Sequence, residues 1–220
     1  MRNVRSFFSD YYLGSVFGLA SGRGRRRRLS DRDTDLAYAR FRRIRERAEG
    51  RCEDPALCRE RFIRPLLRDV LGFHLGTGDD RVHALFATAD EETGGARPLL
   101  VAFCGGWDED PDAGRGAKHP VRRLEQALAR LGLRHGLVIT GQAARLVRAP
   151  GDGPRGGYLE VDLAGLADDE DPESFAAFLR LFSLASFAPD ASGAVPIEAI
   201  ERESREHATN VSEDLSEAPG

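Results

Sequence analysis

The 220-residue sequence has few lysines, few cysteines and no long apolar run, and each shortage narrows the classes of protein that fit. Lys118 is the only lysine among 32 basic residues, the rest being arginine. A GC-rich genome accounts for this bias, because arginine and alanine have GC-rich codons. The abundance of arginine is therefore not by itself an indication of phosphate binding.

The three cysteines, Cys52, Cys58 and Cys104, are odd in number and have no metal-binding spacing. This argues against a disulfide scaffold and against a zinc site built on paired cysteines. No apolar stretch approaches the roughly 18 residues that span a bilayer. Residues 1–20 also lack the apolar core of a secretory signal. The sequence therefore predicts a cytoplasmic protein without membrane contact.

Charge is distributed unevenly along the chain. Residues 1–50 hold 13 Arg against 6 Asp and Glu, a net charge of +7, whereas residues 159–220 hold 15 Asp and Glu against 3 Arg, a net charge of −12. This asymmetry favours a basic end that faces a polyanion and an acidic end that faces solvent or a partner.

Residues 36–48 form the clearest amphipathic helix of the sequence. Apolar side chains recur there at spacings of three and four, and arginines occupy the opposite face. We expect Asp33 or Asp35 to cap its N-terminus and Gly50 to end it. Residues 3–19, which are rich in aromatic side chains, have spacings compatible with another short helix.

The centre of the sequence predicts an α/β fold. An Asp-Pro pair opens helix 54–72, and the β-type runs 81–89 and 98–104 follow as a hairpin. Helix 120–132 and strand 135–140 complete a β-α-β unit with 98–104, in which the two strands are parallel neighbours. Further strands are expected at 144–149 and 158–163, and further helices at 175–187 and from Pro196.

Three segments in this arrangement resemble a known family: FIRPLLRDVLGF (residues 62–73), GLVITGQAARLVRA (136–149) and the stretch 157–187. They are similar to the N-terminal region of Eco57I-like restriction–modification methylases, the single-chain enzymes of type IIG restriction and bacterial phage defence. The likeness extends over residues 7–215. It implies a PD-(D/E)xK nuclease-like α/β fold, with a mixed sheet flanked by helices and with N- and C-terminal helical extensions.

The resemblance also implies a division of the chain. Residues 1–50 are expected to form a basic helical segment, residues 51–190 the nuclease-like domain, and residues 191–220 an acidic helix or linker toward a methylase domain. The family's methylase uses S-adenosylmethionine, and its nuclease uses Mg²⁺. The sequence lacks the glycine-rich cofactor motif and the Asn-Pro-Pro-Tyr loop that grips a flipped adenine, so we expect no cofactor in this chain. We expect a fragment, a truncated gene or a free-standing module.

An active nuclease of this family carries an acid at the start of one hairpin strand and a Glu-x-Lys triplet on the next. Asp79 or Asp80 stands at the first position, and the triplet falls on Ala102, Phe103 and Cys104. Mg²⁺ prefers oxygen ligands, which a methyl group and a thiol do not offer. The resemblance therefore implies a degenerate site without a metal, in which Asp80 is the one remaining catalytic candidate.

Candidate DNA contacts lie in the basic N-terminal segment. Each arginine that neutralises a phosphate adds salt-dependent affinity. A disordered loop in an arginine-biased sequence explains the four-arginine run equally well, and both interpretations stay open. Our leading hypothesis is a non-catalytic module that supports DNA binding and docks on a methylase domain or subunit. The proposed phosphate contacts are Arg25, Arg26, Arg27, Arg28, Arg40, Arg43 and Arg47.

Two other functions also fit the sequence. The first is an active Mg²⁺-dependent DNA endonuclease that uses Asp80 with displaced acids, namely Glu91, Glu92 or Asp108. The second is a protein-interaction module with no nucleic-acid contact. The acidic cluster at 107–112 suits an exposed loop better than a divalent ion, because calcium loops require a regular spacing of oxygen ligands.

Overall fold

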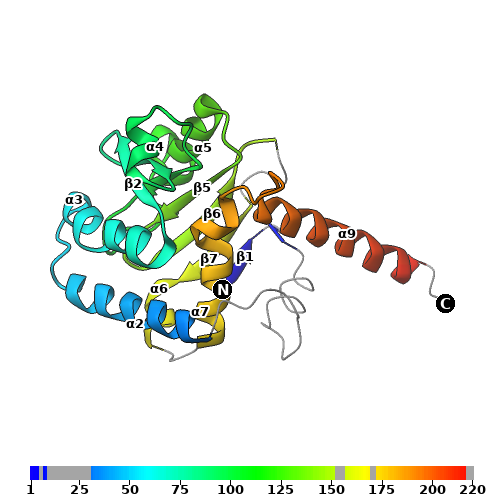
Figure 1. Cartoon of the computed structure of the whole chain (residues 1–220), viewed down its shortest axis with the longest axis horizontal. Coiled ribbons are helices and arrows are strands. Elements are labelled where there is room, and N and C mark those ends of the chain that lie inside the picture. Colours follow the sequence, from blue (N-terminus) through cyan, green and yellow to red (C-terminus); the bar gives the residue numbers. More distant parts are fainter. Residues whose placement is uncertain (5–6, 9–30, 152–156, 169–171, 217–220) are drawn as a thin grey trace.

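The computed structural model describes residues 1–4, 7–8, 31–151, 157–168 and 172–216. Its centre is a seven-stranded mixed β-sheet flanked by helices (Figure 1). The mixed α/β architecture predicted from the sequence is therefore confirmed.

Seven strands form the sheet: β1 (Arg2–Val4), β2 (His74–Gly78), β3 (Val82–Phe86), β4 (Leu100–Cys104), β5 (His135–Ile139), β6 (Ala143–Arg148) and β7 (Tyr158–Asp162). Their order across the sheet is β1-β7-β6-β5-β4-β3-β2. Strands β4 and β5 run parallel and are connected through helix α5 (Pro120–Leu131), so the predicted β-α-β unit is confirmed. Strands β3 and β4 are antiparallel, as the hairpin prediction requires.

The remaining helices follow the same chain order. None of the helices in the described part of the chain is long and apolar enough to cross a membrane. Their bounds are α2 (Asp31–Ala48), α3 (Pro55–Cys58), η1 (Arg59–Ile63), η2 (Leu66–Leu71), α4 (Ala89–Thr93), η3 (Gly116–Lys118), α6 (Leu163–Asp168), α7 (Pro172–Phe182), α8 (Leu184–Phe187) and α9 (Pro196–Ser216).

Helices α3, η1 and η2 together form the predicted helical segment before the hairpin. The Asp54 side chain accepts the N–H of Leu57 at 2.8 Å, and Pro55 occupies the first turn. Pro65 has no N–H to donate, and π-helical turns lie on both sides of it. Gly72 ends the segment in the left-handed conformation, with φ of 84°.

Several predicted elements differ from the structure. Residues 3–4 of the predicted helix 3–19 belong to strand β1, which pairs with β7, while residues 5–6 and 9–19 lie outside the described residues. The prediction of Asp33 or Asp35 as the N-cap is wrong, because α2 begins at Asp31 and both residues lie inside it. The single helix predicted at 175–187 is divided into α7 and α8.

Strand β2 is absent from the sequence prediction, because its residues HLGTG show no apolar alternation. It forms through pairing with β3, with a bulge between Leu75 and Gly78. A Cβ atom at Gly78 would lie 2.0 Å from the Val82 carbonyl oxygen. The close approach of these two backbones therefore requires glycine at this position.

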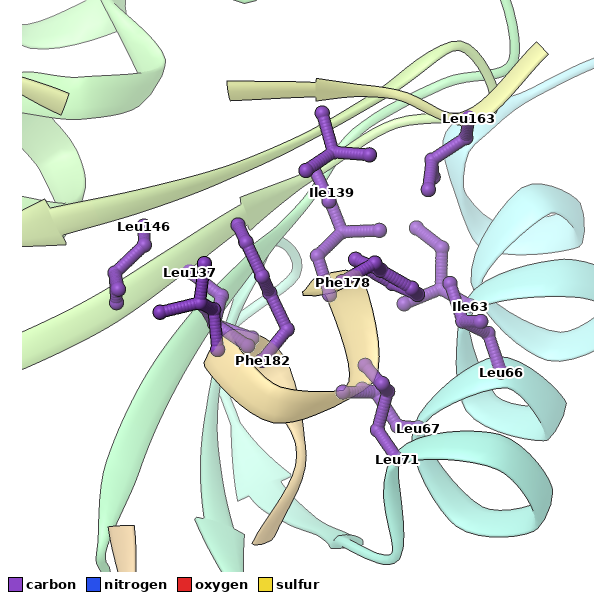
Figure 2. Close-up of a cluster of buried hydrophobic side chains, with 14 of the residues drawn as sticks. Ile63, Leu66, Leu67, Leu71, Leu137, Ile139, Leu146, Leu163, Phe178 and Phe182 are labelled. Atoms are coloured by element: carbon purple, nitrogen blue, oxygen red, sulfur yellow. The ribbon is translucent and has the colours of Figure 1, made fainter. Parts of the chain in front are cut away.

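Two hydrophobic layers hold the helices on the sheet. On one face, residues of η2 and α7 such as Leu67 and Phe178 pack toward Ile139 of β5 (Figure 2). On the other face, Leu124 of α5 packs with Val138. Burial of each such side chain contributes about 1.5–3 kcal/mol, which makes the sheet a rigid base for the residues at its edge.

Helix α9 docks on the sheet through a buried carboxylate. The Glu201 side chain is 3% exposed and is hydrogen-bonded to His135 Nε2 at 2.8 Å and to Arg148 Nε at 2.6 Å. Burial acts to raise the pKa of Glu201, but the hydrogen bonds and charges of His135 and Arg148 outweigh it and lower this pKa to about 2. Arg148 also lies 3.9 Å from the ring centroid of Phe7, so both chain ends contact the same β6 side chain.

We expect Glu201→Gln to lower the free energy of unfolding by about 3–5 kcal/mol, since it leaves Arg148 buried without a counter-charge. Because the pKa of Glu201 is lowered in the folded state, its stabilising contribution is present above pH 4.5 and is lost as the pH falls toward 2. Urea denaturation at several pH values between 7 and 3 measures both effects.

The matched control is Glu198→Gln, which changes an exposed carboxylate of the same helix that pairs with Arg134. We expect this control to cost less than about 1 kcal/mol. Equal losses in the two variants would contradict the anchoring role of Glu201.

Candidate functional site

The two positions at which the resemblance expects a carboxylate and a lysine are both buried. Ala102 and Cys104 lie on β4 and point into the core on the face that carries η1 and η2. Burial raises the pKa of Cys104 to about 12, so its thiol stays protonated. Strand β4 therefore uses these two side chains for packing.

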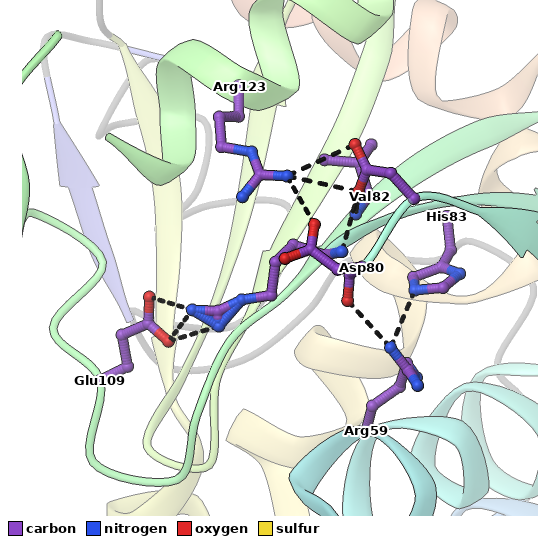
Figure 3. Close-up of polar contacts among 8 residues, drawn as sticks. Arg59, Asp80, Val82, His83, Glu109 and Arg123 are labelled. Carbon is purple, nitrogen blue, oxygen red and sulfur yellow. Dashed lines mark hydrogen bonds and ion pairs between the residues drawn. The ribbon is translucent and has the colours of Figure 1, made fainter. Parts of the chain in front are cut away.

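Asp79 and Asp80 form the turn between β2 and β3 at the edge of the sheet. Asp79 Oδ1 accepts the N–H groups of Arg81 at 2.8 Å and of Val82 at 2.6 Å, so this carboxylate builds the turn. Burial acts to raise the pKa of Asp79, but these hydrogen bonds and Arg123 lower it below its ordinary value. The Asp80 side chain is 78% exposed and pairs with Arg123 at 3.0 Å (Figure 3).

The guanidinium groups of Arg81 and Arg123 both lie near the ring of Phe103 on β4. The Arg81 and Arg123 guanidinium carbons are 5.2 Å and 5.6 Å from its ring centroid. Arg81 donates two hydrogen bonds from Nη2 to Glu109, at 2.9 Å and 3.0 Å (Figure 3). Glu109 also accepts the N–H of Gly106 at 2.7 Å. A loop carboxylate is thus fixed at the end of β4.

Arg59 of η1 contacts the turn between β2 and β3 from the face of the sheet that carries η1 and η2. Its Nη1 donates to the Asp80 carbonyl oxygen at 2.9 Å and lies 3.4 Å from Nε2 of the buried His83 (Figure 3). Burial first and Arg59 second lower the pKa of His83, which favours the neutral imidazole. We call the six residues Arg59, Asp79, Asp80, Arg81, Glu109 and Arg123 the arginine corner.

The acids proposed for a displaced nuclease site have other partners. Glu91 accepts the N–H of Ala87 at 2.9 Å. Glu92 accepts the N–H of Thr77 at 2.6 Å, and Asp108 accepts from Gln142 at 3.0 Å. No group of three or more His, Cys, Asp or Glu side chains in the described part of the chain is arranged to hold a metal ion. The donor set around Asp80 therefore does not fit a hard divalent cation.

The acidic cluster 107–112 lies in a loop in which Asp108, Asp110 and Asp112 are exposed, as predicted, but several of its side chains have partners. Asp112 accepts two hydrogen bonds of 2.7 Å from Arg145, in addition to the Arg81–Glu109 pair. Trp107 packs edge-on against Phe62, with ring centroids 5.2 Å apart. The loop that follows β4 is thus fastened to the sheet by ion pairs and by an aromatic contact.

Three of the seven predicted phosphate contacts lie on one exposed face of α2. Arg40, Arg43 and Arg47 are spaced by three and four residues and are exposed, opposite the buried Phe41 and Ala48. The other four, Arg25, Arg26, Arg27 and Arg28, lie outside the described residues.

Sequence reasoning missed the arginines of the corner. Arg59, Arg81 and Arg123 come from three distant segments, and no local motif distinguishes them from the many other arginines of the chain. The acidic cluster 107–112 indicates that cationic partners lie nearby in the fold, since partly buried carboxylates require them. The partners themselves follow from the tertiary fold alone.

Comparison with protein-family models gives no match, and comparison with curated proteins and with solved structures gives none either.

We expect Cys104 to resist alkylation in the native protein, because burial and the high pKa both suppress the reactive thiolate. Treatment of the native protein with iodoacetamide at pH 8 should leave Cys104 unmodified. The same treatment in about 6 M guanidinium chloride, which unfolds ordinary domains, should modify it. Peptide mass spectrometry distinguishes Cys104 from Cys52 and Cys58. Equal labelling of Cys104 under both conditions would show that it is accessible.

Proposed function

We propose that this chain is a non-catalytic, nuclease-like DNA-binding module of a bacterial restriction–modification DNA adenine methylase. The exposed arginine face of α2, formed by Arg40, Arg43 and Arg47, is the observation that carries the DNA-binding part of the proposal. Arginine at this spacing presents three guanidinium groups to one surface, where each can neutralise a backbone phosphate.

The nuclease-like part of the proposal rests on the resemblance and on the mixed sheet. A helix, an antiparallel pair and a β-α-β connection follow one another in the order that the resemblance implies. The non-catalytic part is supported by the burial of Ala102 and Cys104 and by the pairing of Asp79, Asp80 and Glu109 with arginines. A nuclease of this type needs carboxylates that are free to bind Mg²⁺.

Docking on a methylase domain is the second part of the proposed role. Helix α9 is held to the sheet near Glu201, and its far end extends away from the rest of the fold (Figure 1). A helix anchored at one end in this way suits a connector to a second domain or subunit.

We expect the triple variant Arg40→Gln, Arg43→Gln, Arg47→Gln to weaken binding to a labelled DNA duplex about tenfold or more at low salt. The slope of log K against log salt should become shallower by about 3, at roughly 0.9 per phosphate contact. Fluorescence anisotropy with two unrelated duplex sequences measures both quantities and tests whether the loss is independent of sequence.

The matched control removes the same charge from three exposed arginines on other elements, Arg115, Arg130 and Arg202. It should change affinity and slope less than the α2 variant. If both triple variants bind DNA equally well, α2 is not the contact surface.

We expect no cleavage of methylated or unmethylated DNA by the purified chain in the presence of Mg²⁺ or Mn²⁺. The physical reason is that Asp79, Asp80 and Glu109 are each paired with a guanidinium group, and Ala102 and Cys104 offer no oxygen ligand. Agarose gel analysis of supercoiled plasmid detects a single nick per molecule. Cleavage that disappears in Asp80→Ala would contradict the non-catalytic assignment and would support the endonuclease alternative.

A further inference from the structure

The ion pairs of the arginine corner are asymmetric in their exposure. The Arg123 side chain is 27% exposed and packs over Phe103, whereas its partner Asp80 is 78% exposed. The Arg81 guanidinium lies over the same ring and is paired with Glu109. The cations are therefore fixed by packing, and the exposed carboxylate of Asp80 is the member of the network that can move.

Asp79 and Asp80 differ in what they hold. Asp79 accepts two backbone N–H groups and so maintains the turn. The Asp80 carboxylate makes its one side-chain bond in the described structure to Arg123, while the Asp80 backbone is held separately by Arg59. Rotation of the Asp80 side chain would therefore free an Arg123 donor without disturbing the turn.

We propose that the arginine corner binds a backbone phosphate of duplex DNA, and that Asp80 is the exchangeable counter-ion that this phosphate replaces. The inference rests on the proposed DNA binding and extends it to a second contact surface. A phosphate oxygen accepts from guanidinium in the same geometry as a carboxylate, and it carries the charge needed to replace one. Arg123, whose donor Asp80 vacates, then contacts the phosphodiester, while Arg81 stays paired with Glu109.

The arginine–carboxylate network at Arg145 differs from the corner in its second counter-ion. Arg145 is 2% exposed and is bonded both to Asp112, which is 53% exposed, and to Glu160, which is 15% exposed, so replacement of Asp112 would leave this cation paired with Glu160. Arg123 is the corner cation whose counter-charges, Asp79 and Asp80, are the more exposed partners. The corner is thus the place where DNA can exchange for a protein carboxylate.

Substitution of Asp80 tests the exchange directly. We expect Asp80→Asn to raise affinity for a labelled duplex about threefold to tenfold, because DNA no longer competes with the carboxylate for Arg123. Arg123→Gln should lower affinity, and the double variant Asp80→Asn, Arg123→Gln should lose the gain. Thermal unfolding of each variant checks that the substitutions leave the fold intact.

The matched control is Asp90→Asn, which removes the same charge from an exposed carboxylate on α4. It should change affinity less than twofold, since long-range charge effects are screened at physiological salt. If Asp80→Asn and Asp90→Asn give the same affinity as the native chain, or if the gain survives in the double variant, the corner is not a phosphate site.

Failure of the inference and failure of the proposed function give different results. If the native chain and Asp80→Asn both fail to bind duplex at low salt, the DNA-binding proposal and the corner inference fall together. If the native chain binds through α2 but Asp80 and Arg123 variants are neutral, the inference alone falls.

Discussion

The pairing of arginine with carboxylate is the interaction on which the loops and the C-terminal helix of this fold depend. Arg145 illustrates it: the side chain is buried in the sheet, lies 4.1 Å from the Tyr158 ring centroid and binds Asp112 through two parallel hydrogen bonds. Taking these charges out of water costs several kcal/mol per ion, and the attraction offsets that cost when the geometry is bidentate. The planar guanidinium group of arginine donates two parallel hydrogen bonds to one carboxylate. The ammonium group of lysine, a residue almost absent from the chain, is a point charge without this geometry.

The same pairing determines what the edge of the sheet can do chemically. A site for a divalent cation needs converging carboxylate oxygens that are free to coordinate the metal. At the arginine corner, Asp79, Asp80 and Glu109 are each bonded to a guanidinium group. A metal would have to displace two arginines that packing holds over Phe103. This arrangement is the basis for the anion exchange that we propose at Arg123.

The sequence allowed the elements with strong local signals to be predicted, and the others depend on contacts between distant segments. Asp54 with Pro55 marks a helix start and Gly72 a helix end through backbone chemistry that acts over a few residues. Strand β2 carries no such signal, since it is formed by pairing with β3. The same holds for the candidate site: the exposed arginines of α2 follow from helical periodicity, whereas Arg123 meets Asp80 across 43 residues of chain.

Under the proposed nuclease-like assignment, apolar side chains on β4 avoid the free-energy cost of burying charged groups. Ala102 and Cys104 are covered by the helical face of the sheet, where an unpaired carboxylate or ammonium would carry a large desolvation cost. A bound cation compensates that cost in an active nuclease. Once cleavage is not required, alanine and a protonated thiol remove the cost and add apolar contacts. Selection for stability alone then favours apolar side chains at these two positions.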